Sequence, residues 1–280
     1  MPVTRPSIAD KRRAFRKLHE SGCFIIPNPW DVGSARYLQS LGFQALASTS
    51  SGLAWSQGRP DNTLPRERVL THLRELVEAT DVPVNADFEN GFATDAAGVG
   101  ESVRLAAQTG VAGLSIEDST GLAATPLFEL ADAVSRIRAA RRAIDAAGGD
   151  TLLVARAECF LVGRPDLEET IARLRAYANA GADCLYAPGI RTIDEIRTIV
   201  DAVKPKPVNL LVASPSELTM QKIADLGVRR VSVGGALARA AWGGFMYAAR
   251  LLANEGSFAG LTGLAGAPPH PDLNALFSAT

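Results

Sequence analysis

The stretch Val82–Phe92 reads VPVNADFENGF and begins like a buried β-strand. Its first residues are apolar and β-branched, but it ends in two carboxylates, Asp87 and Glu89, before an Asn-Gly turn signal. These two acids alternate with apolar residues, so in an extended strand both side chains point to the same face. Two like charges on one face repel each other, and we therefore expect a positive group between them.

The composition is that of a soluble globular protein, with 47% hydrophobic and 21% charged residues among 280. The net charge of −1 shows no basic or acidic excess, so we expect neither nucleic acid nor a membrane surface as a partner. No apolar run approaches the roughly 20 residues that span a bilayer. The first 20 residues lack a signal-peptide pattern, and Cys23, Cys159 and Cys184 form no CxxC pair. We expect a cytoplasmic protein.

The chain repeats one pattern: a short apolar run, a polar or glycine-containing turn, and a helical stretch. The apolar runs cover 23–27, 45–49, 82–87, 113–118, 152–158, 184–189, 207–213 and 230–235. The helical patterns cover 31–42, 66–80, 96–110, 131–148, 166–181, 192–203, 216–227 and 236–256. Alternating strands and helices imply right-handed βαβ units and a parallel sheet. Eight units, with no GxGxxG after the first strand, predict a (β/α)₈ (TIM) barrel rather than a dinucleotide-binding fold.

We expect one domain over 1–280, with the barrel over about 20–250 and a helical extension over about 251–280. The helical stretch 236–256 is long and rich in small residues, and a Pro/Gly segment and a short last helix follow it. Such a tail packs either on a neighbouring subunit or on the surface of its own chain.

Polar residues fall at the predicted strand ends, where TIM barrels form their active sites. They are Asp31, Ser50, Ser51, Gly52, Asp87, Glu89, Glu117, Asp118, Arg156, Glu158 and Ser214. Several carboxylates at one mouth predict a hard-cation site, because Mg²⁺ takes oxygen ligands and binds through one or two carboxylates plus substrate oxygens. Salt bridges to arginine are the alternative, but one arginine cannot neutralise Asp87, Glu89 and Glu117 together.

Arg156 has the planar fork that binds a carboxylate or phosphonate, and we predict it as the substrate anchor; pairing with Glu158 or Asp87 is the alternative. Ser51-Gly52 is either a cradle for a small anion or a plain turn. Gly234-Gly235 is either a phosphate site or a close turn into the last helix.

Other chemistries fit the sequence poorly. A Schiff-base aldolase needs a buried lysine at a strand end, but the five lysines fall on predicted helices or before the seventh strand. We expect His19, His72 and His270 to be surface or core histidines, since they lie in helical or terminal segments. Cys159 lies nearest the mouth, yet we expect it to be inert.

Five stretches resemble the isocitrate lyase/phosphoenolpyruvate mutase superfamily in their order and spacing. They are NPWDVGSARYLQSLGFQAL (28–46), SSGLAWSQGRPD (50–61), NADFENGF (85–92), LSIED (114–118) and ARAE (155–158). The resemblance covers about 24–251, most of the chain. It implies a TIM barrel that binds a 2-oxo acid or its enolate on Mg²⁺, with Mn²⁺ as an alternative ion. It also implies a homo-oligomer, a tetramer or dimer, with swapped C-terminal helices.

The resemblance also implies roles for individual residues. Ser51, Gly52 and Leu53 match the substrate-binding turn, and Asp61 matches an acid in the following loop. Asp87 matches the principal Mg²⁺ ligand, Glu89 stands where many members carry a second aspartate, and Glu117 matches the next metal-shell acid. Arg156 matches the substrate-binding arginine. The implied catalytic residues are Asp61, Glu117 and Arg156, and the implied metal ligands are Asp87, Glu89 and Glu117.

One departure from the superfamily pattern restricts the chemistry. Lyases of the family carry a Cys in the loop after strand 4, and mutases carry Lys and Asn there, whereas 119–127 has no Cys, Lys, His or Asn. Decarboxylation of a 2-oxo acid such as oxaloacetate needs mainly an electron sink, and water supplies the final proton. Cleavage of a 2-hydroxy acid, as in 2-methylisocitrate lyase, additionally needs a base and an acid. Asp61, Glu158 and Tyr186 are the candidates.

We therefore predict a Mg²⁺-dependent enzyme that acts on a small 2-oxo or 2-hydroxy acid by C–C cleavage or decarboxylation. The alternatives are P–C bond chemistry on phosphonopyruvate or phosphoenolpyruvate, and a non-catalytic barrel that binds 2-oxo acids.

Overall fold

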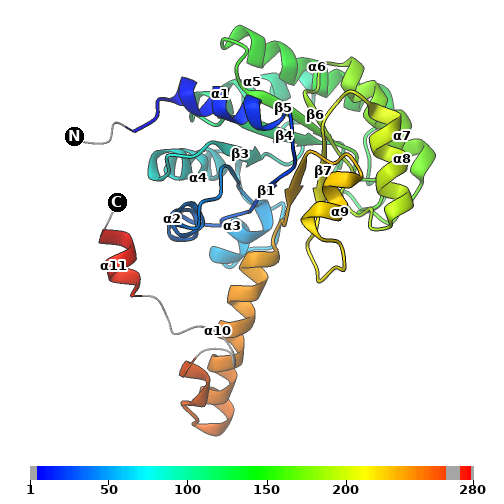
Figure 1. The fold of residues 1–280 in the computed structure, drawn as a ribbon. Helices are drawn as coiled ribbons and strands as arrows, with labels where there is room; N and C mark the ends of the chain where they lie inside the picture. The colour runs from blue at the N-terminus through cyan, green and yellow to red at the C-terminus, as the bar shows by residue number, and fades with distance from the viewer. Residues whose placement is uncertain (1–4, 263–271, 279–280) are drawn as a thin grey trace.

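The computed structural model describes residues 5–262 and 272–278, and its centre is a parallel eight-stranded barrel (Figure 1). The strands are β1 (Phe24–Ile26), β2 (Leu46–Ala47), β3 (Val84–Asp87), β4 (Gly113–Glu117), β5 (Leu152–Arg156), β6 (Cys184–Tyr186), β7 (Val208–Leu211) and β8 (Arg230–Ser232). The α-helices are α1 (Ile8–Leu18), α2 (Val32–Ser40), α3 (Ser50–Ser56), α4 (Arg66–Ala79), α5 (Ala96–Gln108), α6 (Leu130–Ala146), α7 (Leu167–Asn179), α8 (Ile193–Val203), α9 (Met220–Asp225), α10 (Ala236–Glu255) and α11 (Leu273–Ser278).

The strand order is β1-β8-β7-β6-β5-β4-β3-β2, and all paired neighbours are parallel. The ring is nearly closed, because the backbone N–H of Ala47 in β2 donates to the carbonyl of Pro27, just after β1, at 3.0 Å. The predicted TIM barrel is confirmed, and each predicted strand and helix is present within a few residues. Helix α1 coincides with the helical segment on which Lys11 and Lys17 were placed. Helix α3 was not predicted, and it replaces the expected turn at Ser51-Gly52.

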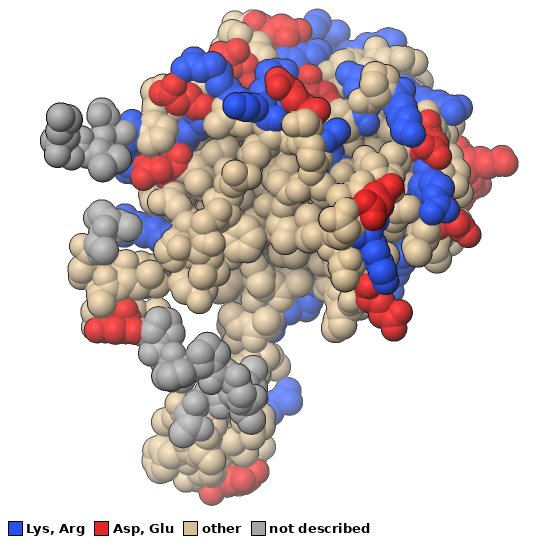
Figure 2. Space-filling model, in the orientation of Figure 1, with Lys and Arg blue, Asp and Glu red and all other residues tan. Residues whose placement is uncertain are grey.

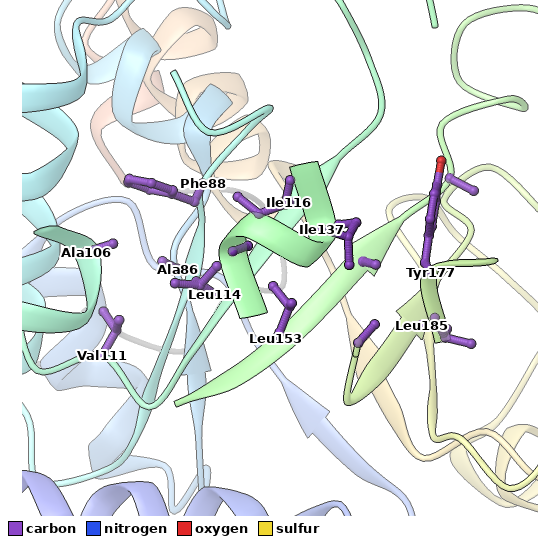
Figure 3. Close-up of a cluster of buried hydrophobic side chains, with 14 of the residues drawn as sticks. Ala86, Phe88, Ala106, Val111, Leu114, Ile116, Ile137, Leu153, Tyr177 and Leu185 are labelled. Atoms are coloured by element: carbon purple, nitrogen blue, oxygen red, sulfur yellow. The ribbon is translucent and has the colours of Figure 1, made fainter. Parts of the chain in front are cut away.

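Strand alternation divides the side chains between two environments. On β3 and β4, Asn85, Asp87, Ser115 and Glu117 alternate with apolar residues. The apolar set faces outward and packs under the helices, as Figure 3 shows for Ala86, Leu114, Ile116 and Leu153 beside Ile137 of α6. The main core therefore lies between the barrel and its helices. The inner set is polar, which places chemistry inside and above the barrel.

Helix α1 closes the N-terminal end of the barrel, opposite the strand ends that carry the acids. Ser7 caps the helix by accepting from the N–H of Asp10, and Phe15 is fully buried. A Cβ at Gly113, the first residue of β4, would lie 2.6 Å from the Phe15 ring, so only glycine fits beneath this ring. Phe15 belongs to a separate core cluster with the first residues of several strands. One end of the barrel is thus sealed with apolar side chains.

Helix α10 follows β8 and runs away from the barrel (Figure 1). Its only fully buried residue is Ala238, whereas Trp242, Phe245, Met246 and Tyr247 are exposed. The space-filling view shows little charge along this projection (Figure 2). The last helix, α11, contacts α2, and the predicted Pro/Gly segment falls mostly outside the described residues. The single-domain division and the swapped helices remain predictions.

The described helices include none that combines the length and apolar composition needed to cross a membrane.

Candidate active site at the barrel mouth

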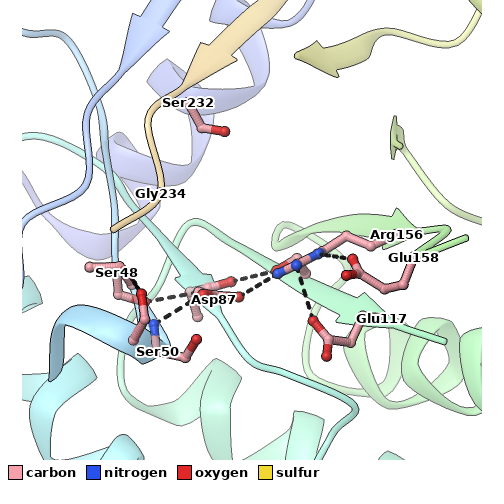
Figure 4. A network of polar contacts seen from close by, with 12 residues as sticks. Ser48, Ser50, Asp87, Glu117, Arg156, Glu158, Ser232 and Gly234 are labelled. Carbon is pink, nitrogen blue, oxygen red and sulfur yellow. Dashed lines mark hydrogen bonds and ion pairs between the residues drawn. The ribbon is translucent and has the colours of Figure 1, made fainter. Parts of the chain in front are cut away.

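Asp87 is the last residue of β3, and backbone contacts fix its position. Its N–H donates to Ser48 Oγ at 2.8 Å, and its Oδ2 accepts from the N–H of Ser50 at 3.0 Å. Ser48 and Ser50 flank the junction of β2 and α3, so the strand next to β3 holds the carboxylate (Figure 4). Its side chain is 19% exposed and lines the central cavity. Asp87 therefore has a fixed direction and oxygen lone pairs accessible from the mouth.

Arg156 is the last residue of β5 and forms ion pairs with three carboxylates (Figure 4). Its Nη1 lies 2.7 Å from Asp87 Oδ1, its Nη2 lies 3.1 Å from Glu117 Oε2, and its Nε lies 2.8 Å from Glu158 Oε1. The guanidinium also lies 5.1 Å from the centre of the Tyr186 ring. The pairing of Arg156 with Asp87 and Glu158, given above as the alternative, is thus present, and the role of Arg156 as substrate anchor remains a prediction. Each guanidinium nitrogen already has an acidic partner, so Arg156 organises the acids besides facing the cavity.

Glu89 departs from the expected strand pattern. The strand ends at Asp87, and Glu89 has a positive φ of 47°, a backbone conformation that is uncommon outside glycine. The alternation that placed both acids on one face does not extend to Glu89. Glu89 is 8% exposed, has no ion pair among the described residues and does not line the cavity. Burial, followed by the charges of Asp87 and Asp61, raises the pKa of Glu89 to about 8.

Asp118, one residue beyond β4, connects the mouth to helix α7. Its Oδ1 accepts from the N–H of Glu158 at 2.8 Å, and its Oδ2 accepts from Tyr177 Oη at 2.5 Å and from Arg173 Nη1 at 3.1 Å. Arg173 also contacts Glu169 and the carbonyl of Phe128. Apart from the Arg173–Glu169 pair within α7, these bonds cross from one element to another, so this buried network fixes Glu158 relative to the loop after β4.

The predicted substrate-binding turn is the first turn of helix α3. Thr49 is the N-cap, and its Oγ1 accepts from the N–H of Gly52. Ser51 lines the cavity, whereas Gly52 and Leu53 do not, and both are buried. A Cβ at Gly52 would lie 2.8 Å from Cβ of Trp30, which explains why a glycine stands here. The hydroxyl of Ser51 is therefore the group of this turn that a ligand meets.

A cavity of about 710 Å³ opens at the strand ends. Among the residues predicted from the sequence, Ser51, Asp61, Asp87 and Arg156 line it, whereas Glu89 and Glu117 lie behind its wall. Asp61 stands at the exposed rim; burial of part of its carboxyl and the nearby charge of Asp87 raise its pKa. Burial also raises the pKa of Glu117 well above its usual value. The mouth therefore gathers more carboxyl groups than Arg156 pairs with, because Asp61 and Glu89 have no ion pair among the described residues.

The acids fit a divalent cation that keeps several waters. Asp61, Asp87 and Glu89 interact electrostatically with one another, and the charge of Arg156 acts on all three. Within 5–262 and 272–278, no three His, Cys, Asp or Glu side chains are gathered into a complete metal cage. Mg²⁺ does not require one, because one or two carboxylates, water and substrate oxygens complete its shell. Asp87 is the best-placed direct ligand; roles for Glu89 and Glu117 remain predictions.

The loop after β4, which lacks the family's acid–base residues, is a short hairpin held by hydrogen bonds between its own residues. Ser119 and Leu127 form an antiparallel bridge, and the N–H of Thr120 donates to the carbonyl of Pro126 at 3.0 Å. Asn90 Nδ2 donates to the carbonyl of Ser119. This hairpin contains no Cys, Lys, His or acidic side chain, so it brings no such group to the mouth.

Several cavity residues were not recognised from the sequence: Asn28, Ser48, Asn85, Ser115, Arg230 and Ser232. Asn85 and Ser115 precede Asp87 and Glu117 by two positions, so strand alternation could have found them. Asn28 Oδ1 accepts from the N–H groups of Val233 and Gly234, both at 2.9 Å. That bond uses the Gly234 N–H for a turn and disfavours the phosphate site at Gly234-Gly235. For Arg230, no feature of the neighbouring sequence indicated that its side chain lines the cavity.

The residues that we expected to be inert show no catalytic arrangement. The three cysteines are free, and burial raises the pKa of the Cys159 thiol. His72 is buried in α4 and His19 packs against Phe15 and Phe24. His270 lies outside the described residues.

A closed barrel with an acidic mouth ordered around one arginine is the architecture that the sequence resemblance implied. The chain belongs to the phosphoenolpyruvate phosphomutase family, whose sequence pattern it matches over residues 15–253. This places it in the isocitrate lyase/phosphoenolpyruvate mutase superfamily and confirms the resemblance.

Three relatives illustrate the range of the family. The chain is 31% identical over 243 residues to an oxaloacetate decarboxylase of Pseudomonas entomophila (strain L48), covering 84% of this chain and 82% of the relative. A protein of Burkholderia cenocepacia J2315, provisionally described as a lyase/mutase, has a crystal structure with a TM-score of 0.91, 49% identity and 97% coverage of both chains. The crystal structure of a phosphonopyruvate hydrolase with oxalate and Mg²⁺ has a TM-score of 0.84 and 26% identity, covering 96% of this chain and 95% of the other.

Proposed function

We propose that this protein is a Mg²⁺-dependent carbon–carbon lyase, with Mn²⁺ as an alternative ion, that decarboxylates or cleaves a small 2-oxo or 2-hydroxy acid. The observation that carries the proposal is the gathering of acids around Asp87, more than Arg156 pairs with, in a cavity that also presents Arg156 and Ser51. Carboxyl oxygens gathered in this way can bind a divalent cation, and an anionic substrate can bind beside that cation. The oxaloacetate decarboxylase relative supports the carbon–carbon chemistry, and the hydrolase structure with oxalate and Mg²⁺ supports a divalent cation in this family's site.

Bound Mg²⁺ would supply positive charge near the substrate oxygens where negative charge develops. The protein provides the positioning: Asp87 is held by Ser48, Ser50 and Arg156, and the Ser51 hydroxyl faces the cavity. The guanidinium of Arg156 is oriented by Glu158 and Glu117, so it faces an incoming carboxylate without a change of rotamer.

Protonation of the product carbon needs an acid. The hairpin at 119–127 supplies none, which leaves water and the rim residue Asp61. The raised pKa of Asp61 favours a carboxyl that holds a proton on an oxygen facing the cavity. We therefore propose Asp61 as the proton donor for cleavage of 2-hydroxy acids, with water sufficient for decarboxylation.

The test of the metal site is oxalate binding by calorimetry, with and without Mg²⁺, because oxalate mimics the enolate of pyruvate. We expect wild-type protein to bind oxalate only with Mg²⁺, and Asp87→Ala to abolish this binding. Asp145→Ala is the matched control, since Asp145 lies at the far end of α6 and is exposed. Unchanged binding in Asp87→Ala would show that the metal ion lies elsewhere.

The test of the reaction is a panel of 2-oxo acids, 2-hydroxy acids and phosphonopyruvate, followed by NMR of the products. We expect pyruvate from oxaloacetate faster than the Mg²⁺ background, and loss of that excess in Asp87→Ala. Phosphate release from phosphonopyruvate alone would favour P–C bond chemistry. Ligand-induced thermal stabilisation without turnover of any candidate would indicate a non-catalytic binding barrel.

A further inference from the structure

The interior of the barrel below the mouth is polar. TIM-barrel interiors are normally filled by layers of bulky branched side chains. Here the inner positions include Ala47, Asn85, Ser115, Asn209 and Ser232. The cavity is lined by Ala47, Asn85, Ser115 and Ser232 and reaches Arg230, the first residue of β8. Figure 4 shows Ser232 on β8, in the upper part of that view and apart from the Asp87–Arg156 pair.

Arg230 carries a guanidinium into this space. Arg230 is 2% exposed. Its Nε donates to Asn209 Oδ1 at 2.7 Å, and its Nη1 donates to Asn85 Oδ1 at 3.3 Å. Asn209 lies on the neighbouring strand β7, whereas Asn85 lies on β3, so the side chain crosses the interior of the barrel. These two neutral acceptors occupy two of the five N–H groups of the guanidinium.

The described part of the chain supplies no counter-charge to Arg230. Arg230 forms no ion pair with any Asp or Glu in 5–262 or 272–278, whereas Arg156 above it has three. Its electrostatic neighbours are Arg156, Cys184 and Tyr186. Burial raises the pKa of the Cys184 thiol and raises that of Tyr186 to about 12, so both are neutral at physiological pH. A buried, unpaired guanidinium is costly for a fold.

We propose that Arg230, with Asn85, Asn209 and Ser232, forms an internal binding site for a small monovalent anion at the floor of the cavity. The anion has the size of a chloride ion or a carboxylate group, because small polar side chains line the site. It neutralises Arg230 and accepts its remaining N–H groups. Two sources supply this chemistry: a free ion from solution, or a second carboxylate of the substrate that reaches down from the mouth.

The first arm tests the free ion, and its outcome does not depend on the proposed reaction. Thermal unfolding is followed while chloride or formate replaces a bulky anion such as gluconate at constant ionic strength. For a free ion, we expect the melting temperature of the wild type to rise with the logarithm of the chloride or formate concentration. Arg230→Met should abolish this dependence. Arg229→Met, the matched control, should keep it, because the Arg229 guanidinium bonds to the carbonyl of Gly22 instead.

The second arm tests the substrate carboxylate. Mg²⁺-dependent binding of oxalate, which fits the mouth alone, is compared with binding of longer 2-oxo dicarboxylates. If the substrate supplies the anion, Arg230→Met should weaken the longer acids at least tenfold and leave oxalate unchanged. Unchanged oxalate binding in Asp87→Ala, together with a normal chloride response, would contradict the metal site and leave the anion site intact.

A bromide soak of wild-type crystals keeps the proposal testable if Arg230→Met does not fold. A free anion predicts an anomalous peak within hydrogen-bond distance of the Arg230 guanidinium. A substrate carboxylate predicts instead that a crystal soaked with a longer dicarboxylate shows a carboxylate there. The proposal is overturned if neither peak appears and neither arm shows a dependence on Arg230.

Discussion

His72 shows how one buried side chain makes stability depend on pH. It lies on α4, is 2% exposed, and its Nε2 has no hydrogen-bond partner. Burial, and then the charge of Arg68, lowers its pKa to about 4. The unfolded chain takes up a proton near pH 6.5, whereas the folded protein does not, so the stability held above pH 6.5 is lost as the pH falls toward 4.

We expect His72→Leu to weaken the dependence of the free energy of unfolding on pH. Between pH 7.5 and pH 5.5, the wild type should lose about 1 kcal/mol more of its free energy of unfolding than the variant. The measurement is urea unfolding at both pH values, with pH 8 as the reference that isolates any packing change. His19, whose pKa burial lowers to about 3, contributes equally to both proteins. Equal pH dependence in the two proteins would contradict a neutral buried His72.

At the scale of elements, the site depends on contacts between strand ends and helices. Asp87 of β3 is held from the β2–α3 junction, and Arg156 of β5 binds acids at the ends of β3 and β4 and just beyond β5. Asp118 then ties the end of β4 to α7 and to the segment after β5. Each tether joins elements that are separated in the sequence, and together they fix the acids at distances at which they would otherwise repel.

Tyr177→Phe tests the tether between β4 and α7. Tyr177 is 1% exposed, and its hydroxyl donates to Asp118. Removing a hydrogen bond to a buried carboxylate should cost about 2 kcal/mol of the free energy of unfolding. Because Asp118 also holds the N–H of Glu158, we further expect a lower kcat in any reaction identified by the substrate panel.

Tyr37→Phe is the matched control, since Tyr37 is 42% exposed on α2. It should change neither stability nor kcat measurably. A loss in Tyr177→Phe no larger than that in Tyr37→Phe would mean that Asp118 is held sufficiently by Arg173 alone.

At the scale of the whole molecule, α10 leaves a large apolar surface exposed. Phe245 is 62% exposed and Tyr247 53%, along a helix that projects from the barrel (Figures 1 and 2). Large exposed apolar patches mark interaction surfaces. The expected dimer or tetramer with exchanged C-terminal helices would cover it, and this assembly remains a prediction.

Light scattering coupled to gel filtration tests the assembly. We expect the wild type to elute as a dimer or tetramer and Phe245→Asp to shift the distribution toward the monomer, because burying an unpaired carboxylate in an apolar interface is unfavourable. Leu41→Asp, which changes an equally exposed residue at the end of α2, should leave the assembly intact. A monomeric wild type would contradict the prediction that the apolar surface of α10 is an interface between subunits.

The sequence by itself determined the eight βα units, the parallel barrel and the end of the barrel that carries the chemistry. These features follow from local periodicity, which is two in strands and 3.6 in helices, and from polar residues at strand ends such as Asp87 and Arg156. The sequence also showed that 119–127 lacks the acid–base residues of the family.

Only the tertiary structure decided which charges meet. The three ion pairs of Arg156, the turn of Glu89 away from the strand pattern, and the helix at Ser50–Ser56 all depend on residues from several strands. The lack of an ion pair at Arg230 among the described residues likewise depends on residues from several strands. Whether a guanidinium finds a carboxylate depends on neighbours far along the chain, and only the closed barrel determines which residues those neighbours are.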